Sequence, residues 1–494
     1  MIPEDVSGAA ASELFVRGDA AMLITGPWAL GDLGTRWPLA VAPIPALLQP
    51  SRPLLTVEVV VLSPRARQGE AAQQFARYLH GVEGARLRAT IGKQIVTDEQ
   101  VVKQLDNPLL VQFARALGDG VPMSTARTMK LVWEPGQRAL RRVLRGAAEP
   151  SVAARDAQRE VEEALRPPPP PRDPLPYLVA LGLGLGALAV VELRRRRTPA
   201  RPGQAAAYLF AAPMQLVMIV LAGVPLVVGA GMAFFHYDAG RWSFVGLHNL
   251  VDILWSSGVP PWSPPSFYYT LGVTIVWTVA NVSLHLAIGV FLALCLRNPA
   301  RRLRGVYRIL LILPWAVPNY ITGLVWRGLF NRQFGALNAL LVWLGGEPIS
   351  FFARFWTAFA ANLATNVWLG FPFMMVVTLG ALAQVPKEVE EAALLDGATP
   401  LQRLFRVTLP IIWPTLLPSV ILGAVWTFNM FNVIFLVSGG EPDGASEILV
   451  SQAYRWAFSR NHRYGYAAAY ALLIALVLFA QGWLARRATR GKQA

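Results

Sequence analysis

The residues with the most distinctive types and spacing lie in a polar segment, residues 386–410, between two long apolar runs. Glu391-Ala392-Ala393 is followed after three residues by Gly397, and nine more residues lead to Val407-Thr408-Leu409-Pro410. Small side chains leave one face of a helix with little relief, which a helix needs if it must seat deeply in a groove of another protein. The segment therefore predicts docking onto a partner rather than catalysis.

Two short helices are expected in this segment. Pro386 suits the first position of the first helix, and Gly397 can supply the left-handed cap that ends it. Negative charge at the positive end of this helix comes from Glu388, Glu390 and Glu391.

The second helix should follow at once. Thr399 is its expected N-cap, Pro400 takes its first position, and Pro410 is expected to close it before the next apolar run. The alternative for the whole segment is an ordinary amphipathic cytoplasmic loop.

Residue sets for catalysis or metal binding do not stand out. The histidines His236, His248, His285 and His462 lack metal-like spacing, and the sequence shows no nucleophile–base set or paired acids. His285, inside an apolar run, leaves a proton relay and a helix-packing role open. No Gly-x-x-x-x-Gly-Lys-Ser/Thr phosphate loop occurs, so a partner must bind ATP if ATP drives this protein. We expect no active site, no metal and no cofactor on this chain.

Membrane spans must position these residues, because 54% of the 494 residues are hydrophobic and only 15% are charged. Seven segments have about the length that a bilayer requires. They are Tyr177 to Leu193, Tyr208 to Phe235, Phe267 to Leu296, Val306 to Trp326, Phe355 to Leu382, Trp413 to Val437 and Tyr466 to Leu484.

Basic residues collect in alternate connections between these segments, and such residues mark the cytoplasmic side. The rich connections hold Arg194 to Arg197 and Arg201; Arg297, Arg301, Arg302, Arg304 and Arg308; Lys387, Arg403 and Arg406; and Arg486, Arg487, Arg490 and Lys492. Seven spans then place the N-terminal region outside and both the Glu391 segment and the C-terminus inside. Because these residues explain much of the net charge of +15, nucleic-acid binding is not favoured. The single cysteine, Cys295, cannot form an intramolecular disulfide.

Residues 1–165 differ from the rest, since they show mixed α/β patterning and no apolar run of span length. Val57 to Leu62 reads as a buried strand. Helices are expected at Ala71 to Leu79, at Pro108 to Leu117 after the N-cap Asn107, and at Val152 to Leu165 after the N-cap Ser151. The proline-rich residues 166–176 predict a semi-rigid extended spacer before the first span at 177–193.

The polar segment resembles the EAA loop of the inner-membrane subunits of ABC importers. That pattern is Glu-Ala-Ala, three residues, Gly, nine residues, an aliphatic residue, any residue and Leu-Pro, and every element is present. By this resemblance the segment is the coupling helix that docks on a separate ATPase subunit. The residues that carry it are Glu391, Ala392, Ala393, Asp396, Gly397, Leu409 and Pro410.

Residues 207–494 resemble the permease subunit of maltose-type sugar importers. The matching stretches are Phe244 to Asn249, Leu313 to Pro318, Asn366 to Phe373 and Gly439 to Pro442, besides the EAA loop. By this resemblance the residues that line an intramembrane sugar site are Asn366, Leu369, Gly370, Phe373, Phe428, Asn429 and Asn432.

Amides suit such a pathway because they donate and accept hydrogen bonds without charge. Asn429 and Asn432 lie three residues apart, which predicts one shared helix face. The alternative is that the asparagines, Asn366 included, only join helices to one another. Phe373 stands where the family has a tyrosine, so the same sugar cannot be assumed. Gly370-Phe371-Pro372 is expected to break its span locally.

Leu14 to Trp28, followed by Val41 to Pro45, resembles the carboxyl-terminal half of maltose-type sugar-binding proteins that feed ABC importers. The resemblance implies that Trp28, and less specifically Trp133, stack on sugar rings, the alternative being that each indole packs a core. The family's first lobe and a secretory signal are missing from the sequence, which leaves two expectations. Either the span that begins at Tyr177 inserts with its N-terminus outside, or the protein begins upstream of Met1 with a signal peptide and the missing lobe.

Together these features predict a polytopic α-helical membrane protein of about seven spans with the ABC importer permease fold, carrying an N-terminal α/β binding-protein-like half-domain. The expected function is ATP-driven sugar import across a bacterial inner membrane. The implied partners are an ABC ATPase dimer that holds ATP and Mg, a second permease subunit, a free solute-binding protein, a sugar and membrane lipid.

Two other functions are considered. One is a membrane sensor or docking subunit that uses the half-domain without transport. The other is an ion-coupled secondary transporter, which is disfavoured because no acidic residue lies mid-span.

Overall fold

The computed structural model describes residues 8–31, 33, 38–46, 51–63, 69–116, 118, 120–144, 146, 148–195, 204–238, 240–255, 260–264, 266–297, 304–460 and 462–490. The chain forms two compact units, Met1–Met129 and Lys130–Ala494. Of the basic residues that set the expected orientation, Arg196, Arg197, Arg201, Arg301, Arg302 and Lys492 lie outside the described ranges.

The first unit is built from short helices around one pair of strands. The helices are α1 (Gly8–Arg17), η1 (Pro27–Gly31), α2 (Gly69–His80), α3 (Val82–Thr90), α4 (Glu99–Lys103), α5 (Pro108–Ala116) and η3 (Arg127–Met129). Strand β1 (Leu54–Leu55) pairs in parallel with β2 (Val121–Pro122), so that Leu54 faces Val121. A small apolar core gathers Ala85, Ala89, Val96 and Val101.

Local capping chemistry was predicted well in this unit. Helix α2 covers the expected range, and the Asn107 side chain accepts hydrogen bonds from the backbone N–H groups of Leu109 and Leu110 at 3.0 and 3.3 Å, which confirms it as the cap of α5.

The buried strand predicted at Val57 to Leu62 is wrong. These residues form no strand and their side chains are exposed. A buried strand needs partners on both edges, and in the described part of the unit β1 pairs only with β2, over two residues.

The second unit begins with a helical hairpin, α6 (Lys130–Leu144) and α7 (Pro150–Ala164). The helix expected at Val152 to Leu165 is thereby confirmed, but it starts earlier, so Ser151 lies in its first turn and is not its N-cap. The proline-rich residues that follow are free of helix up to α8, and the backbone N–H of Arg172 donates to the carbonyl of Phe244 at 2.7 Å. The proline segment therefore has an anchor in this unit.

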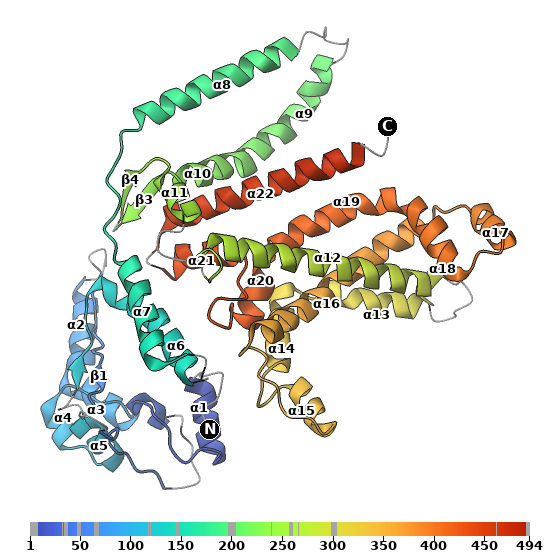
Figure 1. Cartoon of the computed structure of the whole chain (residues 1–494). Helices are drawn as coiled ribbons and strands as arrows, with labels where there is room; N and C mark the ends of the chain where they lie inside the picture. The colour runs from blue at the N-terminus through green and yellow to red at the C-terminus, as the bar shows by residue number, and fades with distance from the viewer. Residues whose placement is uncertain are drawn as a thin grey trace. The chain divides into compact units, whose positions relative to one another are not determined.

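The remaining chain is mainly helical (Figure 1). In order it contains α8 (Leu175–Arg195), α9 (Gln204–Met218), η4 (Ile219–Gly223), α10 (Val224–Met232), β3 (Phe235–Asp238), β4 (Arg241–Phe244), α11 (His248–Trp255), α12 (Phe267–Arg297), α13 (Arg304–Ala316), α14 (Asn319–Leu329), α15 (Ala336–Trp343), α16 (Phe355–Leu382), α17 (Lys387–Leu395), α18 (Pro400–Gln402), η5 (Arg403–Thr408), α19 (Leu409–Phe428), α20 (Phe431–Val433), η6 (Ile434–Ser438), α21 (Leu449–Phe458) and α22 (Tyr464–Arg490).

Six helical segments among the described residues are long and apolar enough to cross a membrane. The expected span at Val306 to Trp326 is instead a bent pair, because α13 and α14 meet at 93°. Pro318 explains the bend, since it has an extended backbone and acts as the N-cap of α14. Counting this pair as one span gives the seven that the sequence predicts.

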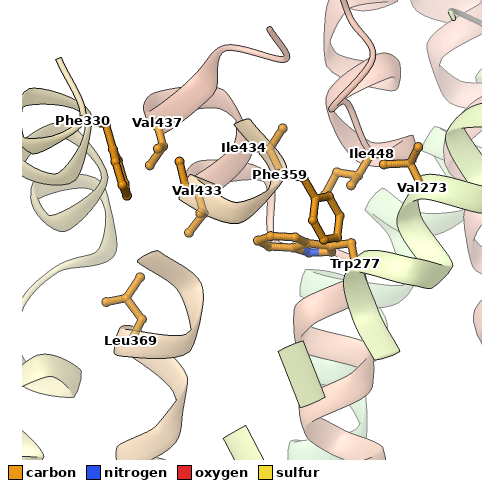
Figure 2. Close-up of a cluster of buried hydrophobic side chains, with 10 residues drawn as sticks. Val273, Trp277, Phe330, Phe359, Leu369, Val433, Ile434, Val437 and Ile448 are labelled. Carbon is orange, nitrogen blue, oxygen red and sulfur yellow. The ribbon is translucent and has the colours of Figure 1, made fainter. Parts of the chain in front are cut away.

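One apolar core of the membrane unit forms where α12 and α16 pack along each other, and another gathers around α22. Trp277 of α12 and Phe359 of α16 meet edge to face, with ring centroids 6.1 Å apart. Figure 2 shows that Val433 and Ile434 of the α20–η6 segment point into the same cluster. This core therefore fixes the short segment that follows α19 against α12 and α16.

Candidate coupling loop and substrate pathway

Helix α17 has the ends that its residues predict, with one correction. Pro386 is the N-cap, with an extended backbone, rather than the first helical residue. Gly397 has a φ of +76°, the left-handed region that glycine occupies without strain. The N–H groups of Gly397 and Ala398 donate to the carbonyls of Leu394 and Ala393, each at 3.0 Å, so the helix ends in a Schellman motif.

Helix α18 has the predicted cap, but the predicted end is wrong. Thr399 and Gln402 form a reciprocal capping box, with hydrogen bonds of 3.3 and 2.9 Å. The helix does not close at Pro410 and runs from Pro400 to Phe428 as one candidate span. A π-helical stretch, η5, precedes Pro410, and its wider turns relieve the clash of the ring with the preceding turn.

Apolar side chains on the coupling segment are uncovered. Leu394 and Leu395 of α17 are 56% and 88% exposed, and Leu401 and Phe405 beyond the cap are 67% and 64% exposed. The small residue Ala392 is exposed as well. This polar loop therefore presents several large apolar side chains to its surroundings.

Glu390 ties α17 to the spans, and the sequence analysis gave it only a helix-charge role. Its Oε1 lies 2.5 Å from Nη1 of Arg297, the last residue of α12, and accepts a hydrogen bond from Thr408 Oγ1 at 3.3 Å. The side chain of Glu391, in contrast, is exposed. The role of Arg297 could have been suspected from the sequence. Arg297 is a basic residue at the end of a predicted span, and the connection that follows it is predicted on the same side of the membrane as α17.

Figure 1 shows α17 and α18 at one end of α12, α16 and α19, and α20 and α21 at the other end. The second end contains two breaks in the helices. Helix α19 stops at Phe428, Asn429 is its C-cap, and α20 begins at Phe431. Asn429 and Asn432 therefore do not share a helix face, and the prediction of one face is wrong.

The two breaks are joined by amides. Asn432 Nδ2 donates to Oδ1 of Asn319, the first residue of α14, at 3.1 Å. Asn429 is exposed and its Nδ2 donates to the carbonyl of Val425 at 3.0 Å. Sequence reasoning missed Asn319, although it follows the Leu313 to Pro318 stretch directly. Interrupted backbone at membrane depth is tolerated only inside protein or beside a water-filled cavity.

Asn366 belongs to a different environment. It is buried, its Nδ2 donates to Asn281 Oδ1 at 2.8 Å, and its carbonyl accepts from His285 Nε2 at 2.9 Å. These contacts join α12 to α16, as the helix-joining alternative predicts, and they give His285 a packing role. Asn281 was not singled out from the sequence.

The predicted break at Gly370-Phe371-Pro372 is wrong, since α16 is continuous from Phe355 to Leu382. A Cβ at Gly370 would lie 2.3 Å from His285 Cε1, so glycine here permits close packing of α12. The packing of α16 against α12 outweighs the tendency of Pro372 to break a helix.

The other pathway residues are divided. Leu369 and Phe428 are buried in two separate apolar cores. Phe373 is half-buried, and its ring lies 5.6 Å from that of Trp426 and 6.0 Å from that of Trp315. The structure therefore groups Asn429, Asn432 and Asn319 at the breaks, and buries Asn366 and Leu369 between helices.

Trp28 and Trp133 lie in different units and are 70% and 46% exposed. Neither indole packs a core, and stacking on sugar stays a prediction for both.

A cavity of about 430 Å³ lies in the second unit, lined in part by His236, His248 and Trp456 and by none of the predicted pathway residues. Burial lowers the pKa of His236, helped by nearby Arg463. In the described ranges no three His, Cys, Asp or Glu side chains gather as a metal site.

Comparison with known proteins agrees with this geometry. The family model described as binding-protein-dependent transport system inner membrane component matches residues 285–490, which include the coupling segment and the α19–α20 break. The galactooligosaccharides transport system permease protein GanP of Bacillus subtilis is 32% identical over 287 residues, covering 54% of this chain and 66% of that protein. The maltose/maltodextrin transport system permease protein MalF of Salmonella typhimurium is 36% identical over 258 residues, covering 50% of this chain and 49% of that protein.

The chain thus spans about half to two thirds of the length of these relatives. Among solved structures, a bacterial ABC transporter involved in the import of the acidic polysaccharide alginate matches with a TM-score of 0.50 and 20% identity, over 58% of this chain and 95% of that one. At that identity the likeness concerns the fold alone. Residues 285–490 therefore form a permease domain of the binding-protein-dependent transport system inner membrane component family, with the fold of ABC importer permeases.

Proposed function

We propose that this chain is a permease subunit of an ATP-driven ABC importer for sugars of the maltose and oligosaccharide class. In this proposal the chain forms part of the translocation pathway. A separate ATPase binds the segment 386–410 and moves it. The exposed leucines of α17, held on a helix with a fixed end and an ionic anchor, are the observation that carries the proposal.

The coupling step follows from how α17 is held. An ATPase that covers Leu394 and Leu395 gains about 1.5–3 kcal/mol for each leucine that it buries fully. A displacement of α17 reaches α12 through the Glu390–Arg297 ion pair and reaches α19 through Thr408 and η5. Helix α19 ends at one of the breaks, so the loop and the pathway share this rigid element.

The pathway is proposed at the breaks beside Asn429 and Asn432. Discontinuous helices expose backbone and amide groups that can bind a neutral, hydroxyl-rich solute. The aromatic rings of Phe373, Trp315 and Trp426 lie around one another and offer apolar faces of the kind that pyranose rings stack on.

The sugar class comes from the relatives, whose names specify galactooligosaccharides and maltose or maltodextrin. The remaining components are proposed from the same family: an ATPase dimer with ATP and Mg, a second permease subunit, and a solute-binding protein or the binding-protein-like N-terminal region of this chain. The basic connections support the proposal that α17 and the C-terminus lie in the cytoplasm and α6–α7 lie outside.

The test is sugar-stimulated ATP hydrolysis by the purified assembly in nanodiscs, with Leu395→Glu and Gly397→Val as coupling variants. A charge in the apolar contact should weaken coupling about tenfold or more, because one buried leucine is worth 1.4 kcal/mol or more. Leu87→Glu is the matched control, since Leu87 is an exposed leucine of the first unit. Unchanged coupling in both loop variants would remove the role of the segment.

A further inference from the structure

A charged face of α6 meets an acidic loop of the permease part. Glu134, Arg138, Arg141 and Arg142 recur at helical spacing, so they lie on neighbouring positions of one side of α6. Two of these residues join α6 to α7 within the hairpin, since Arg138 pairs with Glu160 at 2.8 Å and Arg142 pairs with Asp156 at 2.9 Å.

The same face then pairs with residues that follow the broken span. Arg141 Nη2 lies 3.0 Å from Glu441 Oε1, and Arg142 Nε lies 3.9 Å from Asp443 Oδ2. At the other end of the face, Glu134 Oε1 lies 3.1 Å from Arg455 Nη1 of α21. These three pairs join the hairpin to two separate parts of the segment 439–455.

The pairs are partly buried, which separates them from ordinary surface ion pairs. Their side chains are between 19% and 30% exposed. The positive charges of Arg460, Arg455 and Arg138 outweigh the opposing effect of burial and lower the pKa of Glu134, so its carboxylate is ionised at neutral pH. Removing one partner of a salt bridge that is shielded from water is destabilising, because the other charge is left buried without its partner.

Arg455 extends the network into the permease part. Its guanidinium pairs with Glu447, which is 1% exposed, and donates to the carbonyl of Gly439. Through Arg455 the hairpin therefore contacts both ends of the loop 439–447.

This loop is joined directly to the broken span. Ser438, the last residue of η6, accepts a hydrogen bond from Asn362 Nδ2 of α16 at 2.9 Å and contacts Ser446 Oγ at 3.2 Å. The α20–η6 segment that ends at Ser438 carries Asn432. A change in the loop is therefore transmitted to the residues at the break.

We propose that the α6–α7 hairpin is an intramolecular clamp. It docks on the segment 439–455 through complementary charge and sets the position of the broken span. The binding partner of this acidic loop is thus a segment of the same chain. The clamp keeps the preceding N-terminal unit tethered to the permease and makes the opening of the pathway depend on the hairpin. This second consequence rests on the proposed transport function, whereas the docking itself does not.

The docking is tested by a distance that requires no transport. Spin labels are placed at Gln137 of α6 and Ser459 after α21, both exposed, in a Cys295→Ser background of the full chain in nanodiscs. The variant Arg141→Glu/Arg142→Glu should shift or broaden the distance distribution. Combining it with Glu441→Arg/Asp443→Arg should restore the distribution, because the charges again complement each other. Arg159→Glu is the control, since Arg159 lies on α7, is 59% exposed and pairs only within its helix in the contacts described.

An unchanged distribution in the reversed pair, or a change that the swapped charges fail to restore, would overturn the docking. The neutral pair Arg141→Gln/Arg142→Gln, measured at low and high salt, covers the case in which charge reversal prevents folding, and it should widen the distribution further at high salt. For the second consequence, sugar uptake by the assembly should fall severalfold in the reversed pair and recover with the swap. Uptake that is unchanged while the distance widens would overturn the control of the pathway and leave the proposed import function intact.

Discussion

Two partly buried residues, Glu390 and Gly370, are central at the scale of single residues. Glu390 connects α17 to α12 through Arg297 and to η5 through Thr408. Gly370 allows the His285 imidazole to lie against the α16 backbone, where that ring donates to the Asn366 carbonyl. Neither role can be read from residue type alone, because each depends on a partner at least 18 positions away in the sequence.

Gly370→Ala should destabilise the membrane unit. The new Cβ would lie 2.3 Å from a ring atom of His285, and the ring cannot swing away without losing its hydrogen bond. Overpacking of this kind costs about 1–3 kcal/mol. Gly380→Ala is the matched control on the same helix, because its Cβ would meet nothing within 4 Å. Thermal unfolding in one detergent should separate the two variants, and equal midpoints would contradict the close packing of α12 on α16.

At the scale of elements, the important feature is the pair of interrupted helices. The α13–α14 bend and the α19–α20 break meet through Asn319 and Asn432, while Asn366 joins two uninterrupted helices, α12 and α16. Amides of the same type therefore have different roles, depending on whether the backbone beside them is helical.

Asn432→Ala and Asn366→Ala should fail in different ways. Asn432→Ala removes an amide at the break and should lower sugar uptake with little change in unfolding. Asn366→Ala leaves the buried Asn281 oxygen without its donor, which costs about 1–3 kcal/mol of stability, while uptake per folded molecule stays near that of the parent. Uptake and thermal unfolding of both variants in one reconstituted preparation decide the matter. A common loss of stability with equal uptake would assign both asparagines to helix packing.

At the scale of the whole molecule, the number of candidate spans and the position of α17 were predictable from the sequence, because both depend on local composition. Caps such as Gly397 and Thr399 were also predictable, since a glycine with positive φ or a hydroxyl N-cap acts within one turn. The positions of the helix breaks were not predictable from the sequence. Pro372 and Pro410 lie within continuous helices, whereas the helix that contains Pro410 is interrupted at Asn429 and Met430.

Tertiary packing explains these differences. Contact with α12 keeps α16 helical through Pro372, and the strand expected at Val57 to Leu62 lacks a sheet to enter among the described residues. The contacts of Glu390, Asn319 and the α6 face were likewise beyond sequence reasoning, since each joins segments that are distant in the chain.

In the proposed mechanism an ATPase moves α17 and thereby opens the pathway at the broken spans. The most direct measurement is uptake of a labelled maltodextrin by proteoliposomes that contain the permease subunits and the sugar-binding component, with or without the ATPase subunit and ATP. We predict accumulation only when the ATPase and ATP are both present, and its loss when Leu395→Glu is introduced. Accumulation at full rate without the nucleotide-hydrolysing subunit would contradict the account.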